Sequence, residues 1–228
     1  TDTGLNLLDP GTTPAENGQF MLFLTAVIKA VDEHQDLLRL SVASAGNDHR
    51  LGANEAPPAI VSMFVGEELA EVLDALEHDV KYEGRGKQVM KLGVDTLPDL
   101  PKDTTDRNRT SPFAFTGNKF EFRMLGSTFS IAGPNIVINT IVADALRQFA
   151  DELEQAHDFN AALHDLVVKN IREHKRIIFN GNNYTDEWKE EAAKRGLLNL
   201  KNSAEALPHF ADKKNIELFE RNGVFTER

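Results

Sequence analysis

The sequence contains no cysteine among its 228 residues. This absence excludes a disulfide framework, a thiolate metal site and a cysteine nucleophile, and it fits a reducing compartment. No run of about 18 apolar residues occurs, so no segment is predicted to span a membrane. Basic residues are also scarce: 25 Lys and Arg stand against 36 Asp and Glu, and 25 − 36 gives a net charge of −11. Nucleic acid is therefore not expected as the main partner, because affinity for its phosphates depends on clustered Lys and Arg.

The chain is long enough, and at 41% hydrophobic residues apolar enough, to bury a substantial core. It starts at Thr1, without a methionine, a basic leader or an apolar signal core. It ends at Arg228 without a closing element. We therefore expect it to be part of a longer protein.

Apolar residues recur at helical spacing along most of the chain. Thr13 to Glu16 has the pattern of a capping box, with Pro14 at the first helical position. Residues 80–109 are rich in Gly, Pro and charge, which predicts a long loop, either a lid or a disordered insertion. The one segment that alternates with period two is 119–125, so it is predicted to be a strand. The expected fold class is α+β, mainly helical with few antiparallel strands, and the predicted helices cover 14–34, 67–78, 134–153, 163–178, 185–195 and a short segment that ends at Gly223.

Residues 47–58 combine Arg, His and two acids with Gly, two Asn and a Pro pair. This composition argues against regular structure and is typical of a flexible loop over a polar ligand, although most polar loops have no catalytic role. Arg50 has the fork geometry that binds a carboxylate. Glu55 is a candidate base or cation ligand.

Two further segments carry charged groups in suggestive arrangements. Residues 106–112 hold two arginines, an amide and two hydroxyls, which suit a phosphoryl group; the alternative is a surface turn whose arginines pair with nearby aspartates. On the predicted strand, Lys119, Glu121 and Arg123 share one face at about 7 Å spacing. An oxygen ligand between two cations suits a divalent metal flanked by polyphosphate. The alternative is a solvent-facing ladder of salt bridges.

Together these three segments resemble glutamine synthetase, specifically its large type III form. Residues 47–58 resemble the family's glutamate-binding flap, with an Arg-Leu pair, a Gly and Glu-Ala-Pro. Residues 108–111 resemble its Asn-Arg-Ser phosphate motif, and 119–123 resemble its basic-x-Glu-x-Arg strand. The motifs follow in the family's order, and the resemblance covers nearly the whole chain.

The resemblance implies a ligase that joins ammonium to glutamate, using ATP and Mg²⁺ or Mn²⁺, through a γ-glutamyl phosphate. It further implies a cytoplasmic, homo-oligomeric ring. Residues 1–179 would be the carboxy-terminal part of a barrel-like α/β catalytic domain, with an insertion at about 66–105. Residues 180–228 would be a helical segment that leads into a carboxy-terminal extension.

The same resemblance assigns roles to individual residues. Arg50 would bind the glutamate carboxylate, and Glu55 would close over the site and help to deprotonate ammonium. Arg109 would be catalytic and would stabilise the phosphoryl group during transfer.

On the strand, Glu121 would ligate the metal, while Lys119 and Arg123 would contact phosphate and Arg123 also the substrate. Lys119 stands where shorter family members have arginine, and no basic residue lies between positions 110 and 118. The family's Asn-Gly-Ser-Gly-x-His segment and its other metal carboxylates are expected before Thr1, so this chain alone is expected to be inactive. The alternative is that these residues form a non-catalytic helical assembly or regulatory module.

Overall fold

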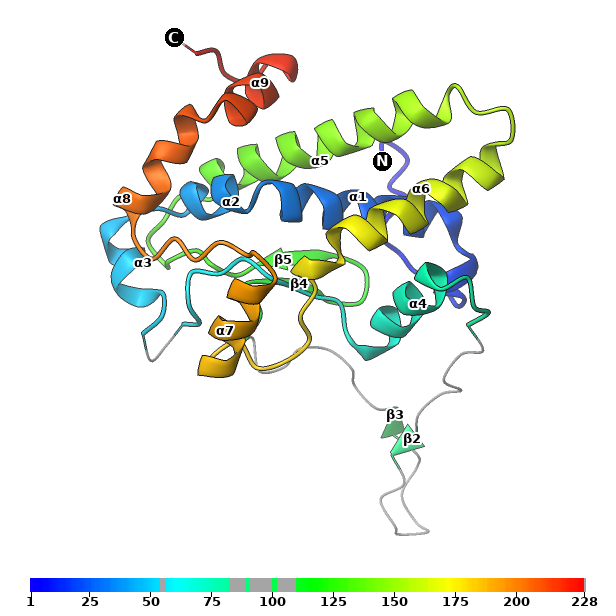
Figure 1. Ribbon diagram of the computed structural model, residues 1–228, viewed down its shortest axis with the longest axis horizontal. Coiled ribbons are helices and arrows are strands. Elements are labelled where there is room, and N and C mark those ends of the chain that lie inside the picture. Colours follow the sequence, from blue (N-terminus) through cyan, green and yellow to red (C-terminus); the bar gives the residue numbers. More distant parts are fainter. Residues whose placement is uncertain (54–55, 83–88, 91–99, 102–109, 228) are drawn as a thin grey trace.

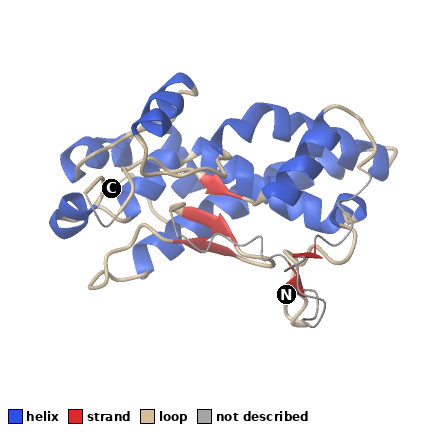
Figure 2. Cartoon of the chain, turned by 90° about the horizontal axis from the view of Figure 1, so that it is seen from below, coloured by secondary structure: helices blue, strands red, loops and turns tan. Residues whose placement is uncertain are grey.

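The computed structural model describes all residues except 54–55, 83–88, 91–99, 102–109 and 228 (Figure 1). Helices make up most of the described chain, whereas its strands are few and short (Figure 2). The prediction of a mainly helical α+β fold is therefore confirmed. The α-helices are α1 (Gly18–Glu33), α2 (Gln35–Ser41), α3 (Ala45–Arg50), α4 (Glu67–Glu77), α5 (Ala132–Leu153), α6 (Phe159–His174), α7 (Asp186–Lys194), α8 (Ser203–Ala206) and α9 (Lys213–Arg221), and the 3-10 turns are η1 (Pro14–Glu16), η2 (Lys175–Ile177) and η3 (Leu207–Ala211).

Three long helices form the centre of the fold. Helix α1 packs against both α5 and α6 (Figure 1). Its apolar residues at spacings of three and four, such as Phe20, Leu24 and Ile28, are fully buried. The helices predicted from periodicity at 67–78, 134–153 and 163–178 are present as α4, α5 and α6 with η2.

A three-stranded sheet lies against this helical layer. Its middle strand, β4 (Phe113–Phe115), pairs antiparallel with β5 (Phe120–Phe122) and parallel with β1 (Met63–Phe64). The rings of Phe115 and of Phe20 in α1 have centroids 5.8 Å apart, so the sheet packs directly on α1. The predicted strand at 119–125 is found as β5. Strands β1 and β4 were not predicted, because short apolar runs show no alternation that separates strand from helix.

The segment 66–105, expected to be an insertion, contains one described helix and a small strand pair. Helix α4 begins it, and β2 (Val89–Met90) later pairs antiparallel with β3 (Leu100–Pro101). Most of the predicted 80–109 loop lies outside the described residues.

The first long helix begins later than predicted, at Gly18. Thr13 makes no side-chain capping bond, and the residues after it form only the short turn η1. Asn17 is the true N-cap, since its side chain accepts a hydrogen bond from the Phe20 amide. The capping-box prediction was wrong: the Glu16 amide donates to the backbone carbonyl of Thr13 at 3.1 Å and not to its side chain.

The last part of the chain returns to the central helices. Thr185 caps α7 as predicted, by accepting a hydrogen bond from the Trp188 amide. The chain then runs through α8 and η3, which contact α2, to α9, which contacts α5 (Figure 1). Gly223 follows α9 with a φ of 66°, in agreement with the predicted helix stop.

Candidate functional site at the end of strand β5

The charged row predicted on the strand is present. Arg123 donates from Nε to Glu121 Oε2 at 3.1 Å, and Lys119 Nζ lies 3.5 Å from Glu121 Oε1. Thr116 Oγ1, from the turn between β4 and β5, donates to Oε1 at 3.4 Å. The two short strands fix this arrangement, because Glu121 pairs in register with Ala114. The row is therefore a set of ion pairs on a defined backbone.

The carboxylate at the centre of the row is held in its ionised form. The hydrogen bond from Arg123 is the main cause that lowers the pKa of Glu121, and the charge of Lys119 adds to it. The Glu121 side chain is 39% exposed, so its oxygens are accessible from solvent. An ionised, accessible carboxylate is the oxygen ligand that Mg²⁺ and Mn²⁺ prefer.

Arg50 reaches the same strand from a short helix that the sequence did not predict. Residues 47–50, expected to be irregular, are the last four residues of α3. Ser44 caps this helix by accepting a hydrogen bond from the Asn47 amide. The cap lies outside the 47–58 segment, so the composition of that segment alone gave no helix signal.

Arg50 and the charged row meet at the end of β5. Arg50 Nη2 donates to the backbone carbonyl of Met124 at 2.7 Å, one residue beyond Arg123. Segments that are 74 residues apart in sequence are thereby joined. Of the six candidate site residues, Arg50, Lys119, Glu121 and Arg123 thus belong to one region. Glu55 and Arg109 lie outside the described residues.

Asn47 was not singled out from the sequence, yet it is central to this junction. Its side chain is buried and bonds to α3, to the preceding loop and to the end of β5. The sequence holds no signal for this role, because the burial that forces the Asn47 amide to find partners is known only from the structure.

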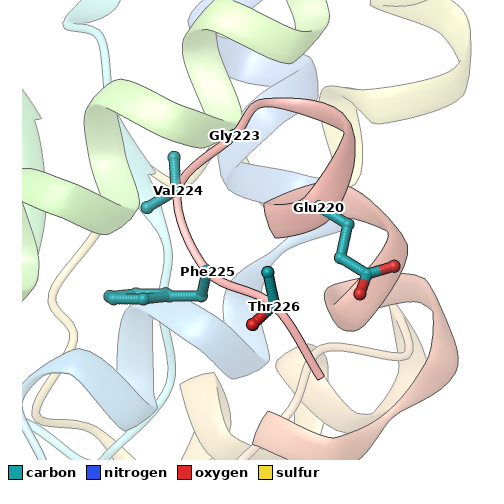
Figure 3. A pocket seen from close by; sticks show the side chains of 5 residues that line it. All are labelled: Glu220, Gly223, Val224, Phe225 and Thr226. Atoms are coloured by element: carbon teal, nitrogen blue, oxygen red, sulfur yellow. The ribbon is translucent and has the colours of Figure 1, made fainter. Parts of the chain in front are cut away.

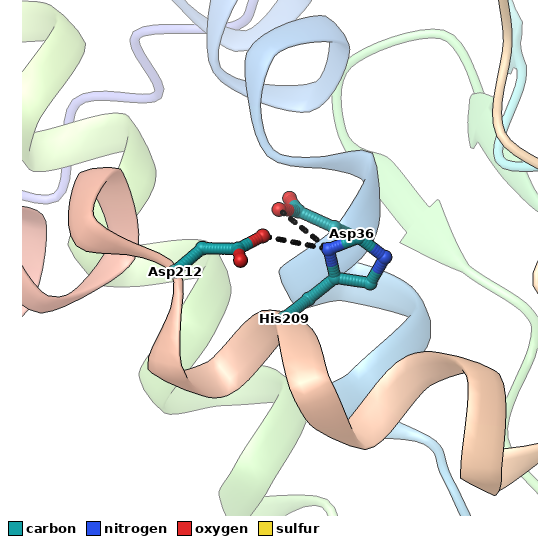
Figure 4. Close-up of side chains that lie close together, drawn as sticks. All are labelled: Asp36, His209 and Asp212. Carbon is teal, nitrogen blue, oxygen red and sulfur yellow. Dashed lines mark hydrogen bonds and ion pairs between the residues drawn. The ribbon is translucent and has the colours of Figure 1, made fainter.

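The described residues contain two other groups that have the spacing of metal ligands. Asp36, His209 and Asp212 approach one another between α2 and η3 (Figure 4). There Lys214 Nζ already lies 2.8 Å from Asp36 Oδ2, so a cation of the protein occupies this carboxylate. The second group, Asp74, Glu77 and His78 at the C-terminal end of α4, lies mostly at the surface, and Glu77 pairs with Lys175.

A hollow of about 450 Å³ lies at the C-terminal end of α9, where the tail turns back along the helix (Figure 3). Glu220 supplies the single carboxylate of its lining, which otherwise consists of Gly223, Val224, Phe225 and Thr226. It shares no residue with the charged row or with α3. The β5 region, where four of the predicted site residues lie together, therefore remains the candidate site.

Comparison with known proteins identifies the relationship. The family model described as "Glutamine synthetase C-terminal domain" matches residues 162–228. Type-3 glutamine synthetase of Dictyostelium discoideum is 50% identical over 229 aligned residues, which cover 99% of this chain and 31% of that protein. Glutamine synthetase of Butyrivibrio fibrisolvens is 51% identical, covering all of this chain and 32% of that protein. The resemblance to glutamine synthetase is confirmed along the whole chain.

The homologous glutamine synthetases are much longer than this sequence. The chain spans about a third of the length of the relatives it matches, including the 45% identical glutamine synthetase of Bacteroides fragilis. Within the described residues, no helix is long and apolar enough to cross a membrane.

Proposed function

We propose that this chain supplies the glutamate- and phosphate-binding part of a glutamine synthetase that forms glutamine from glutamate, ammonium and ATP through a γ-glutamyl phosphate. The observation that carries the proposal is the junction at the end of β5, where Arg50 bonds to the backbone next to the Lys119–Glu121–Arg123 row. The names of the homologous proteins support the same reaction. We further propose that the complete protein is a cytoplasmic, homo-oligomeric ring.

In this proposal the cationic groups bind and orient the two anionic substrates. Arg50 binds a carboxylate of glutamate, and Arg123 contacts both glutamate and the phosphoryl group in transfer. Lys119 contacts the nucleotide phosphates and Arg109 stabilises the transferred group. Phosphoryl transfer needs positioning and charge neutralisation more than covalent participation by the protein, and guanidinium groups supply both. Glu55 closes over the site and accepts a proton from ammonium.

Glu121 fits one ligand position of a magnesium or manganese ion, because it is ionised and accessible. Within the described residues it belongs to no group of three metal-ligand side chains, so further ligands have to come from elsewhere in the complete enzyme. When bound, the ion neutralises charge on the ATP phosphates. Arg123 remains hydrogen-bonded to Glu121 and holds the carboxylate in position.

The test compares glutamine formation by the complete enzyme and its variants. Glu121→Ala should reduce metal-dependent turnover by about 100-fold or more, since it removes a proposed ligand of the ion that neutralises the ATP phosphates. Arg50→Ala should mainly raise the KM for glutamate. Glu191→Ala is a matched control, because Glu191 is similarly exposed and pairs with Arg195 in the same way. The 228-residue chain alone should form no glutamine.

The alternative, a non-catalytic helical assembly or regulatory module, predicts a different result. Under it, neither the Arg50 nor the Glu121 variant would change glutamine formation, and both would behave like Glu191→Ala. Normal turnover by the isolated 228-residue chain would also contradict the proposal as stated, because the chain is proposed to hold only part of the active site.

A further inference from the structure

Asn47 uses its whole side-chain amide in the junction between α3 and β5. Its side chain is 2% exposed. Nδ2 donates to the carbonyl of Val42 at 2.8 Å and to that of Met124 at 2.9 Å. Oδ1 accepts a hydrogen bond from Arg50 Nε at 3.0 Å. Both protons of the amide nitrogen and its oxygen therefore have partners.

The two carbonyls dictate which way this amide faces. A carbonyl oxygen only accepts hydrogen bonds, so the nitrogen of Asn47 has to point toward Val42 and Met124. The oxygen is then left facing Arg50. The two backbone carbonyls, and not Arg50, therefore fix the direction in which Asn47 Oδ1 faces.

These contacts occupy one edge of the Arg50 guanidinium. Nε donates to Asn47 Oδ1, and Nη2 donates one of its protons to the Met124 carbonyl. The opposite edge, formed by Nη1 and the second proton of Nη2, has no partner among the described residues. This edge presents two parallel N–H groups, the geometry that binds a carboxylate in bidentate fashion.

We propose that Asn47 is a positioning residue that holds the Arg50 guanidinium with its free edge toward the glutamate carboxylate. This inference rests on the proposed function of Arg50. An arginine side chain is flexible, and a ligand that has to order it loses affinity. The bond from Asn47 orders the guanidinium in advance, and the shared Met124 carbonyl sets its position relative to the charged row.

The experiment measures steady-state kinetics and thermal unfolding of the complete enzyme carrying Asn47→Ala or Asn47→Asp. Asn47→Ala removes the acceptor for Arg50, and its KM for glutamate should rise about 10-fold or more while the KM for ATP stays within about twofold. Asn47→Asp keeps an oxygen facing Arg50 but sets the other against two carbonyls. Asn47→Asp should therefore lower the melting temperature, but it should raise the KM for glutamate by less than about threefold.

Asn170→Ala is the matched control for lost stability. Asn170 is also a buried asparagine whose Nδ2 donates to a backbone carbonyl, that of Leu166, but it lies on α6 away from α3 (Figure 1). It should lower the melting temperature without changing the KM for glutamate. If Asn47→Ala does not fold, Asn47→Ser is assayed against the same thresholds, because its smaller cavity and hydroxyl disturb the core less.

The outcomes separate this inference from the proposed function. One result would refute the positioning role of Asn47 and leave the proposed function standing. In it, the unaltered enzyme forms glutamine and Arg50→Ala raises the KM for glutamate, but Asn47→Ala changes this KM by less than about twofold. An equal rise in the KM values for glutamate and ATP, or an equal effect of Asn47→Asp and Asn47→Ala, also refutes it. If the unaltered enzyme forms no glutamine, the proposed function fails and this inference fails with it.

Discussion

Asp144 is predicted to anchor the final helix, α9, to the central helix α5. Asp144 is 2% exposed, and its carboxylate accepts hydrogen bonds from Nε and Nη2 of Arg221, at 2.9 Å each. Asn222 Nδ2 also donates to it, at 3.0 Å, as do Arg147 and Gln148 of α5 itself, at 3.0 and 2.8 Å. Replacing Asp144 with alanine should therefore detach α9 before the rest of the protein unfolds.

The expected loss follows from the burial of the two partners. Removing one member of a fully buried ion pair costs about 3–5 kcal/mol. The Arg221 side chain is 42% exposed, so water compensates part of this loss. We expect Asp144→Ala to reduce the free energy of unfolding of α9 by about 2–4 kcal/mol, measured by hydrogen exchange of the amides in 213–221. Arg147→Ala, which removes a half-exposed partner within α5, should cost under about 1 kcal/mol.

The dependence on pH gives a second test. Burial alone would raise the pKa of Asp144, but the bonds from Arg221, Asn222 and Arg147 outweigh it and hold the pKa well below its ordinary value. Because the folded pKa is lowered, the stabilisation is complete above about pH 4 and is lost as the pH falls below that value. The stability difference between the parent and Asp144→Asn should therefore be constant from about pH 5 to 8 and shrink in acid. A difference that persists unchanged to about pH 2, or unchanged protection of α9 in the alanine variant, would refute the reasoning.

Two further substitutions test one packing contact and one ion pair. Gly181→Ala should lower the free energy of unfolding, measured in urea, by about 1–3 kcal/mol. The new methyl group would lie 2.6 Å from the ring of Phe179, which is stacked on Trp188. A loss below about 0.5 kcal/mol would show that the ring moves aside freely. Asp48→Ala should cost about 2–4 kcal/mol, because it leaves the buried Arg39 guanidinium without its carboxylate, and a melting temperature equal to that of the parent would contradict this.

The long helices could be predicted from sequence because their burial repeats at helical spacing. In α1, α5 and α6 the apolar residues that form the periodic pattern are buried or half-buried in the structure. The short elements were missed for a physical reason. Strand β4 consists of three buried residues between turns, and α3 is only six residues long, so neither is long enough to show a period.

The charged residues of the site could be predicted, but their connection could not. Lys119, Glu121 and Arg123 were placed on one face by strand alternation, and their ion pairs agree with that placement. The partner that joins Arg50 to this row is the backbone carbonyl of Met124. Every residue has such a carbonyl, so nothing in the side-chain sequence marks this one as an acceptor.

Two consecutive residues of α3 hold this helix in place from different sides. Asn47 ties the helix to the end of β5, whereas Asp48 ties it to the carboxy-terminal part of the chain. Burial opposes ionisation of Asp48, but the Arg39 guanidinium and the Ser203 amide outweigh it and lower its pKa. Since Arg39 also donates to the Leu200 carbonyl, α3 is fixed from two sides that are distant in sequence. Arg50, at the end of this helix, thus has its backbone position set by the folding of both regions, which explains how a six-residue helix can hold in place the side chain that we propose to bind glutamate.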